Sequence, residues 1–282
     1  MKRKIAALLS ILSLFLVSPA LAAPPTSTAT LETRGTHKTL KLPAEADVSP
    51  VISLGTAVDP KDGKLVEGLA IIHFKDKKAK GGNPAKGPKA TQCWGYLANG
   101  AKWKTVEPWM VNPANLRGLT DSFVFDNIGA DVSKWEDAAD GVVGSGAGFD
   151  ILGDGSQTAS TLVADTSSPD GQNEVYFADV SSGGAIAVTI VWGIFSGPTF
   201  NRRLVEWDQV YDDVDFDWSA SGETGKMDFE NIATHELGHS VGMDDLYNSS
   251  CAQETMYGYA DNAETKKRDL ATGDIKGIDL LY

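Results

Sequence analysis

Residues 228–245 read DFENIATHELGHSVGMDD, and this stretch carries most of the chemical information in the chain. On a helix, His235 and His239 lie four residues apart, so both imidazoles project from the same face. This spacing suits two of the four positions around a tetrahedral zinc ion. Glu236 points beside such a metal rather than at it, so its carboxylate can accept a proton from a water molecule held there.

Gly242 predicts the end of this helix, because a glycine in the left-handed conformation turns the chain back at little steric cost. Asp245, three residues later, can then supply a third protein ligand. Two imidazoles and one carboxylate leave one position open for water, which is typical of catalytic rather than structural zinc sites. The alternatives for the third ligand are the neighbouring Asp244 and the downstream carboxylates of Glu254 and Glu264.

The motif has the order His235-Glu236-x-x-His239-x-x-Gly242-x-x-Asp245 and is followed by Met256. This pattern resembles the metzincin clan of zinc endopeptidases and, within that clan, the matrixin family. The resemblance covers about residues 94–282 and includes residues 274–282, which are similar to the closing helix of matrixin catalytic domains. It implies that Met256 forms the Met-turn beneath the metal.

Two residues depart from the matrixin pattern. Most matrixins have a third histidine where this chain has Asp245, and the same replacement is seen in the snapalysin-type metzincins. Gly258 stands where a proline usually follows the Met-turn, which leaves the wall of the specificity pocket undefined.

The order of the predicted elements agrees with this family. Apolar spacing predicts a helix over residues 120–139, and strands are predicted at residues 109–113, 149–152, 174–180, 185–195 and 204–211. These elements predict an α/β (α+β) metzincin-like fold. By resemblance, its mixed, mostly parallel sheet has five strands and an antiparallel edge strand, with an active-site helix and a C-terminal helix. Residues 185–191 would then be the free edge that pairs with an extended substrate.

The N-terminus has the pattern of a secretory signal. Residues 2–4 are basic, residues 5–17 form an apolar run, and residues 20–22 provide a small-residue cleavage site. The apolar run is too short to span a bilayer. We therefore predict that residues 1–23 are removed and that the mature protein is secreted, extracellular and not bound to a membrane.

Residues 24–90 precede the predicted catalytic domain at residues 91–282. Within them, residues 51–58 and 65–74 are predicted to form a β-hairpin, and residues 75–89 form a linker rich in Lys, Gly and Pro. One interpretation is a pro-segment that ends in a cleavable linker, so that the protein is made as a zymogen. The other is an accessory hairpin that the mature enzyme keeps.

The two parts carry opposite charge. Residues 24–89 contain 11 basic and 7 acidic side chains, whereas residues 90–282 contain 11 basic and 31 acidic ones. Such an acidic domain argues against nucleic-acid partners. The basic segment could dock on it electrostatically, or both charges could serve only solvation.

The chain has two cysteines, Cys93 and Cys251. A disulfide between them is expected in an exported protein, and it would tie the start of the catalytic domain to the loop before Met256. The alternative is that Cys93 is a latency switch whose thiolate occupies the open zinc position, as in animal matrixin zymogens. The residues around Cys93 lack the family's switch sequence, which disfavours this alternative.

One catalytic zinc is the only metal that the residues specify. Outside the motif the histidines are His37 and His73, so the second, structural zinc of animal matrixins is not expected. Acidic loops such as residues 150–154, 165–170 and 208–217 could bind Ca²⁺, although solvated loops are the better interpretation.

Together these features predict a secreted zinc-dependent endopeptidase that hydrolyses peptide bonds of extended polypeptides. Its expected ligands are His235, His239 and Asp245, its general base is Glu236, and its partners are protein or peptide substrates. We expect a monomer. The alternative is a non-catalytic secreted binding or surface protein that retains a metzincin fold, and the presence of Glu236 disfavours it.

Overall fold

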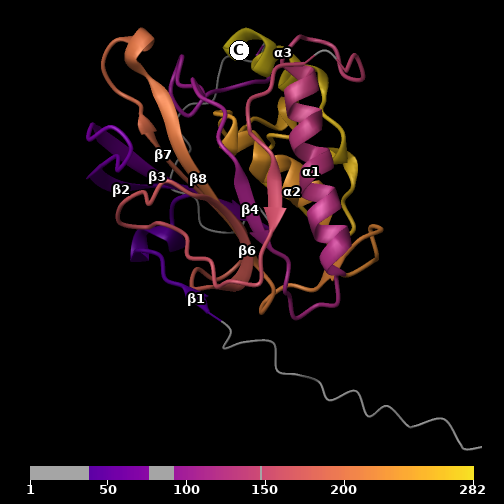
Figure 1. Cartoon of the computed structure of the whole chain (residues 1–282). Helices are drawn as coiled ribbons and strands as arrows, with labels where there is room; N and C mark the ends of the chain where they lie inside the picture. The colour runs from indigo at the N-terminus through magenta and orange to yellow at the C-terminus, as the bar shows by residue number, and fades with distance from the viewer. Residues whose placement is uncertain (1–37, 76–91, 147) are drawn as a thin grey trace, which may run out of the picture. The chain divides into compact units, whose positions relative to one another are not determined.

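A mixed β-sheet with the long helices packed on one of its faces organises the chain (Figure 1). The structure is a computed structural model that describes residues 38–75, 92–146 and 148–282. The predicted signal at residues 1–23 and most of the predicted linker lie outside these ranges. Within the described residues, every helix is too short or too polar to cross a bilayer.

Five strands of this sheet come from the predicted catalytic domain. They are β4 (Trp109–Asn112), β5 (Gly155–Gln157), β6 (Asn173–Val180), β7 (Ala185–Ile194) and β8 (Arg203–Asp212). Neighbours in the order β5-β4-β6-β8 are parallel, and β7 runs antiparallel to β8. The mixed, mostly parallel arrangement predicted for this part is therefore present.

The strand predicted at residues 149–152 is wrong, because the sheet strand after the first helix is β5, which begins at Gly155. Ile151 and Leu152 are buried, but they lie in a loop whose backbone amides both donate to Glu136 Oε1, at 2.9 and 2.8 Å. The apolar side chains of this run are therefore buried in the core, but its backbone does not form a strand.

The predicted N-terminal hairpin is present and extends the sheet. It consists of β2 (Val51–Val58) and β3 (Leu65–Phe74), which are antiparallel. A further short strand, β1 (Thr39–Leu40), pairs in parallel with β6. In the described residues the sheet therefore has 8 strands, in the order β2-β3-β7-β8-β6-β4-β5 with β1 beside β6, because N-terminal segments add three strands to the five of the predicted catalytic domain.

The expectation of a free edge at residues 185–191 is also wrong in this structure. β3 pairs with β7 along its length, from Glu67 opposite Gly193 to Phe74 opposite Ala185. Each backbone donor and acceptor that an edge strand leaves unpaired attracts another extended segment. Here the chain's own N-terminal hairpin supplies that segment.

Helices α1 (Asp121–Ala138), α2 (Phe229–Ser240) and α3 (Thr272–Leu281) contribute to the core on one face of the sheet. Capping residues fix where the first two begin. Thr120 Oγ1 accepts a hydrogen bond from the Phe123 amide, and Asp228 Oδ1 accepts one from the Asn231 amide. The other face is covered by N-terminal residues such as Leu40 and Ala46 and by Leu162 and Ala164.

The remaining elements are short. They are β9 (Trp218–Ser219) and β10 (Met227–Asp228), which pair in parallel, and the 3-10 turns η1 (Ala44–Asp47), η2 (Thr199–Asn201), η3 (Ser249–Cys251) and η4 (Lys266–Arg268).

Cys93 and Cys251 form a disulfide, with their Cα atoms 5.3 Å apart. It connects the start of the domain to the segment before Met256. The alternative, in which Cys93 keeps a free thiolate for a metal, is therefore not the arrangement found.

Candidate metal centre

Helix α2 and the turn after it bring three side chains together. His235 and His239 lie one turn apart on α2, and Gly242, with φ of 103°, reverses the chain after the helix ends. The reversal places Asp245 Oδ1 3.2 Å from His235 Nε2 and 3.6 Å from His239 Nε2. All three side chains are buried, with exposed fractions of 0%, 0% and 1%.

The other polar atoms of these side chains are held by the fold. His235 Nδ1 donates to the Thr255 carbonyl at 2.6 Å, and His239 Nδ1 donates to the Met243 carbonyl at 3.0 Å. The Tyr247 hydroxyl donates to Asp245 Oδ2 at 2.6 Å. These bonds fix the orientation of each imidazole and of the carboxylate, as outer hydrogen bonds do around metal ligands.

The remaining polar atom of each of these three side chains lacks a hydrogen-bond partner among the described residues, and the three atoms lie close together. His235 Nε2, His239 Nε2 and Asp245 Oδ1 are buried without a hydrogen-bond partner. Buried polar atoms without partners are costly and rare in native proteins. A cation with nitrogen and oxygen ligands would satisfy all three, so the donor set fits zinc. Burial lowers the pKa of His235 to about 4, which keeps this imidazole neutral and ready to bind a metal.

The alternative third ligands lie elsewhere. Asp244 Oδ1 accepts a hydrogen bond from the Asp245 amide, Glu254 Oε2 accepts one from the Gly273 amide, and Glu264 pairs with Lys266. In the described part of the chain, the group of potential metal ligands that contains both imidazoles of α2 is completed by Asp245.

Met256 packs directly beneath α2. A Cβ atom added at Gly238 would lie 2.2 Å from Met256 Sδ, so the glycine is what allows this close approach. Asp274 of α3 holds the segment in place, because its carboxylate accepts hydrogen bonds from the amides of Thr255 (2.6 Å) and Met256 (3.1 Å). Sequence reasoning identified Met256 but missed this role of Asp274.

Glu236 is fully buried between two partners from different strands. Thr189 Oγ1 on β7 donates to Glu236 Oε2 at 2.6 Å, and His73 Nδ1 on β3 lies 2.9 Å from Glu236 Oε1. Burial raises the pKa of Glu236 to about 8, and the hydrogen bond from Thr189 acts in the opposite direction. The carboxylate thus lies beside the imidazoles of α2 rather than among the three converging atoms.

His73, which was not predicted to take part in the site, lies next to both Glu236 and His235. Its ring centroid lies 4.0 Å from that of His235, and its Nε2 accepts a hydrogen bond at 3.3 Å from Lys267 Nζ. Burial, and then the charges of His235 and Lys267, hold the pKa of His73 well below its usual range. Sequence reasoning assigned no role to His73 or Lys267. The available signal was a histidine inside the otherwise apolar run of residues 69–74 in a chain with 4 histidines.

A second acidic cluster lies at the far side of the sheet, where Asp165, Asp170 and Glu206 bring carboxylate oxygens within 4.8 Å of one another. Glu206 is fully buried and its Oε1 has no hydrogen-bond partner. Burial, opposed by a hydrogen bond from the Gly171 amide and reinforced by the charge of Asp165, raises the pKa of Glu206 to about 9. The sequence favoured solvated acidic loops over Ca²⁺ binding at residues 165–170, and that preference stays a prediction.

Glu206→Gln is expected to stabilise the metal-free chain at pH 8. Because the pKa of Glu206 is raised above its ordinary value of 4.5, the folded state binds more protons than the unfolded state, and stability falls as pH rises from about 4.5 to about 9. Thermal melts between pH 5 and 9 should show this fall in the wild type and a flatter profile in the variant.

The exposed Asp126→Asn on α1 provides the control for the loss of one negative charge. If the Tm of the Glu206→Gln and Asp126→Asn variants both depended on pH as that of the wild type does, the pH dependence of stability would not come from Glu206.

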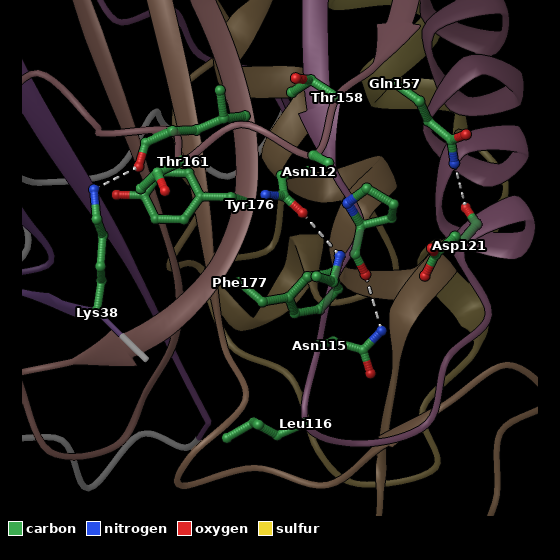
Figure 2. A pocket seen from close by; sticks show the side chains of 14 residues that line it. Lys38, Asn112, Asn115, Leu116, Asp121, Gln157, Thr158, Thr161, Tyr176 and Phe177 are labelled. Atoms are coloured by element: carbon green, nitrogen blue, oxygen red, sulfur yellow. Dashed lines mark hydrogen bonds between the residues drawn. The ribbon is translucent and has the colours of Figure 1, made fainter. Parts of the chain in front are cut away.

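One open cavity lies away from the metal centre. It has a volume of about 510 Å³ and lies by the ends of β4 and β5, beside β6 and next to Lys38 (Figure 2). Its polar side chains are used by the fold: Asn115 Nδ2 donates to the Pro113 carbonyl, Gln157 Nε2 to the Asp121 carbonyl and Lys38 Nζ to the Leu162 carbonyl. None of the residues of the metal centre lines it, and we assign it no function.

Comparison with known proteins agrees with this geometry. Residues 193–282, which include α2, Asp245, the turn at Met256 and α3, match the family model of the matrixins. This part of the chain is similar to the matrixin metalloproteases. The chain is also similar to Metalloendoproteinase 2-MMP of Arabidopsis thaliana, with 35% identity over 77 residues. That match covers 25% of this chain and 19% of the plant protein.

Proposed function

We propose that the protein is a secreted zinc-dependent endopeptidase that hydrolyses extended polypeptides, and that residues 24–90 keep it latent. The observation that carries the first part is the convergence of three buried atoms without partners, His235 Nε2, His239 Nε2 and Asp245 Oδ1, beside the carboxylate of Glu236. The match of residues 193–282 to the matrixins supports the same reaction class.

The residues would act as follows. His235, His239 and Asp245 hold the zinc ion, which when bound supplies a Lewis acid and lowers the pKa of water towards neutrality. Glu236 accepts a proton from the attacking water and returns it to the leaving amine. Thr189 orients Glu236 through its hydrogen bond to Oε2, and Met256 supports α2 from below.

The position of the hairpin supports latency. The side chains of His235, Glu236 and His239 are fully inaccessible to solvent, and β3 takes the place along β7 where an extended substrate would pair. His73 fills the space next to Glu236. A substrate and β3 cannot occupy the same edge, so we favour the pro-segment over an accessory hairpin that stays in place.

The test uses the full chain from residue 24 with a recognition sequence for a site-specific protease placed within residues 76–91. We expect one zinc per chain by elemental analysis, no cleavage of denatured casein before the cut, and casein cleavage that a chelator abolishes after it. Absence of zinc would overturn the proposal. Bound zinc without casein cleavage by the cut chain would favour the alternative, a secreted binding protein that retains the fold.

A further inference from the structure

Lys267 lies in η4 with its side chain fully buried beside the metal centre. Its ammonium donates to the Tyr257 carbonyl and to His73 Nε2, and it forms no ion pair with a carboxylate of the described residues. Lysine is almost never fully buried unless it is paired, because burying an uncompensated charge is costly. The charges of Glu264, Asp245 and Glu236 act on this ammonium, but no carboxylate of the described residues forms an ion pair with it.

His73 shows where an anionic partner would enter. It lies on β3 opposite Ala187 of β7, and the next residue, Phe74, bridges to Tyr259 on the other side. The side chain thus occupies a slot between β7 and the segment at residues 257–259. A substrate that replaces β3 along β7 would place one of its own side chains in this slot.

The two ends of the slot differ in charge. The Nδ1 atom of His73 faces Glu236, whereas Nε2 faces Lys267, so the imidazole separates the carboxylate from the ammonium. Neutral imidazole gives Lys267 a single weak acceptor at 3.3 Å. A carboxylate there would form a charge-assisted hydrogen bond, which is shorter and about twice as strong.

We propose that Lys267 selects substrates that carry an aspartate or glutamate beside the scissile bond, in the position that His73 occupies in this structure. This inference rests on the proposed function, since it assigns a substrate class to the same site. Burial lowers the pKa of Lys267 to about 8, so the ammonium is still mostly protonated at pH 7.

The first experiment measures kcat/KM for the cut, zinc-loaded full chain. Its substrates are peptides that are identical except that each position near the scissile bond carries in turn Asp, Glu, Asn or Gln. At one position we expect the acid to be preferred over its amide by about 10- to 100-fold, as for a hydrogen bond to a charged group. Lys267→Met should remove the preference, whereas Lys267→Arg should retain part of it.

The second experiment separates this inference from the proposed reaction. The cut Glu236→Gln chain, which is not expected to hydrolyse peptides, is titrated with fluorescent acid and amide peptides. The acid peptide should bind at least about 10-fold more tightly, and adding Lys267→Met should equalise the two. Thermal melts of each variant establish that it is folded, and Lys267→Gln replaces Lys267→Met if the latter is not.

The outcomes are distinct. Casein cleavage without an acid preference, or a preference that survives Lys267→Met, would overturn the inference and leave the proposed function intact. No cleavage of casein or of any peptide, together with Lys267-dependent binding of the acid peptide, would overturn the endopeptidase and retain the anion-selective slot. Equal binding of both peptides would overturn the inference.

Discussion

Replacing Glu236 with glutamine is expected to leave the metal bound and to remove nearly all peptide hydrolysis. Glutamine keeps the shape of the side chain, and its amide oxygen can still accept the hydrogen bond from Thr189. It cannot accept the proton of the attacking water, so the loss should reach about 10²- to 10⁴-fold in kcat, the usual contribution of a positioned general base. The proposed ligands His235, His239 and Asp245 are untouched, so zinc content should stay at one per chain.

The measurement compares kcat and zinc content of the cut wild type and the cut variant. Glu230→Gln provides a matched control on the same helix, because Glu230 pairs with Lys134 and Arg268 and does not face the metal centre. This control should retain most of its activity. A Glu236→Gln enzyme with wild-type kcat would mean that another group accepts the proton.

Cutting the chain within residues 76–91 is expected to raise peptidase activity by about 10²- to 10⁴-fold. While the linker is intact, the hairpin pairs with β7 intramolecularly and therefore at high effective concentration. After the cut the two pieces can separate, and dilution favours their separation. Activity per chain should therefore rise as the cut protein is diluted, which a kinetic assay across a dilution series would detect.

His73→Ala in the uncut chain separates two ways in which the hairpin could block activity, through the His73 side chain and through the pairing of β3 with β7. This change removes the side chain next to Glu236 but keeps the pairing of β3 with β7, which is made by main-chain atoms. We expect a smaller gain of activity than cutting produces. The uncut chain that carries the same recognition sequence is the control, and equal activity before and after the cut would show that the hairpin is a permanent part of the enzyme.

Local patterns in the sequence were sufficient for the parts of the site that lie close together along the chain. His235, Glu236 and His239 follow from helical spacing, and the reversal at Gly242 follows from the conformational freedom of glycine. The two strands of the hairpin were also predicted with the bounds that the structure gives them, since alternation and a turn sequence define a hairpin locally. The first helix and most of the strands of the catalytic part were also predicted from local patterns, whereas their mostly parallel arrangement was expected from the resemblance to matrixins.

A short apolar run without clear periodicity did not predict secondary structure correctly. Residues 149–152 were predicted as a strand, yet their apolar side chains fill the core from a loop, and the strand forms at residues 155–157. A short apolar run indicates burial, and only the tertiary structure decides whether its backbone pairs with a strand or with a side chain such as Glu136.

What surrounds the metal centre was decided by tertiary structure alone. Main-chain hydrogen bonds at a sheet edge accept any extended segment, so no residue in β7 specified that β3 would be its partner. That pairing brings His73 next to Lys267, a residue 194 positions away, and closes the site that residues 228–245 had defined. The sequence by itself was sufficient to nominate the candidate ligands and base, because their geometry is that of one helix and one turn. The occupancy and charge of the surrounding slot depend on contacts between distant segments, which no local pattern encodes.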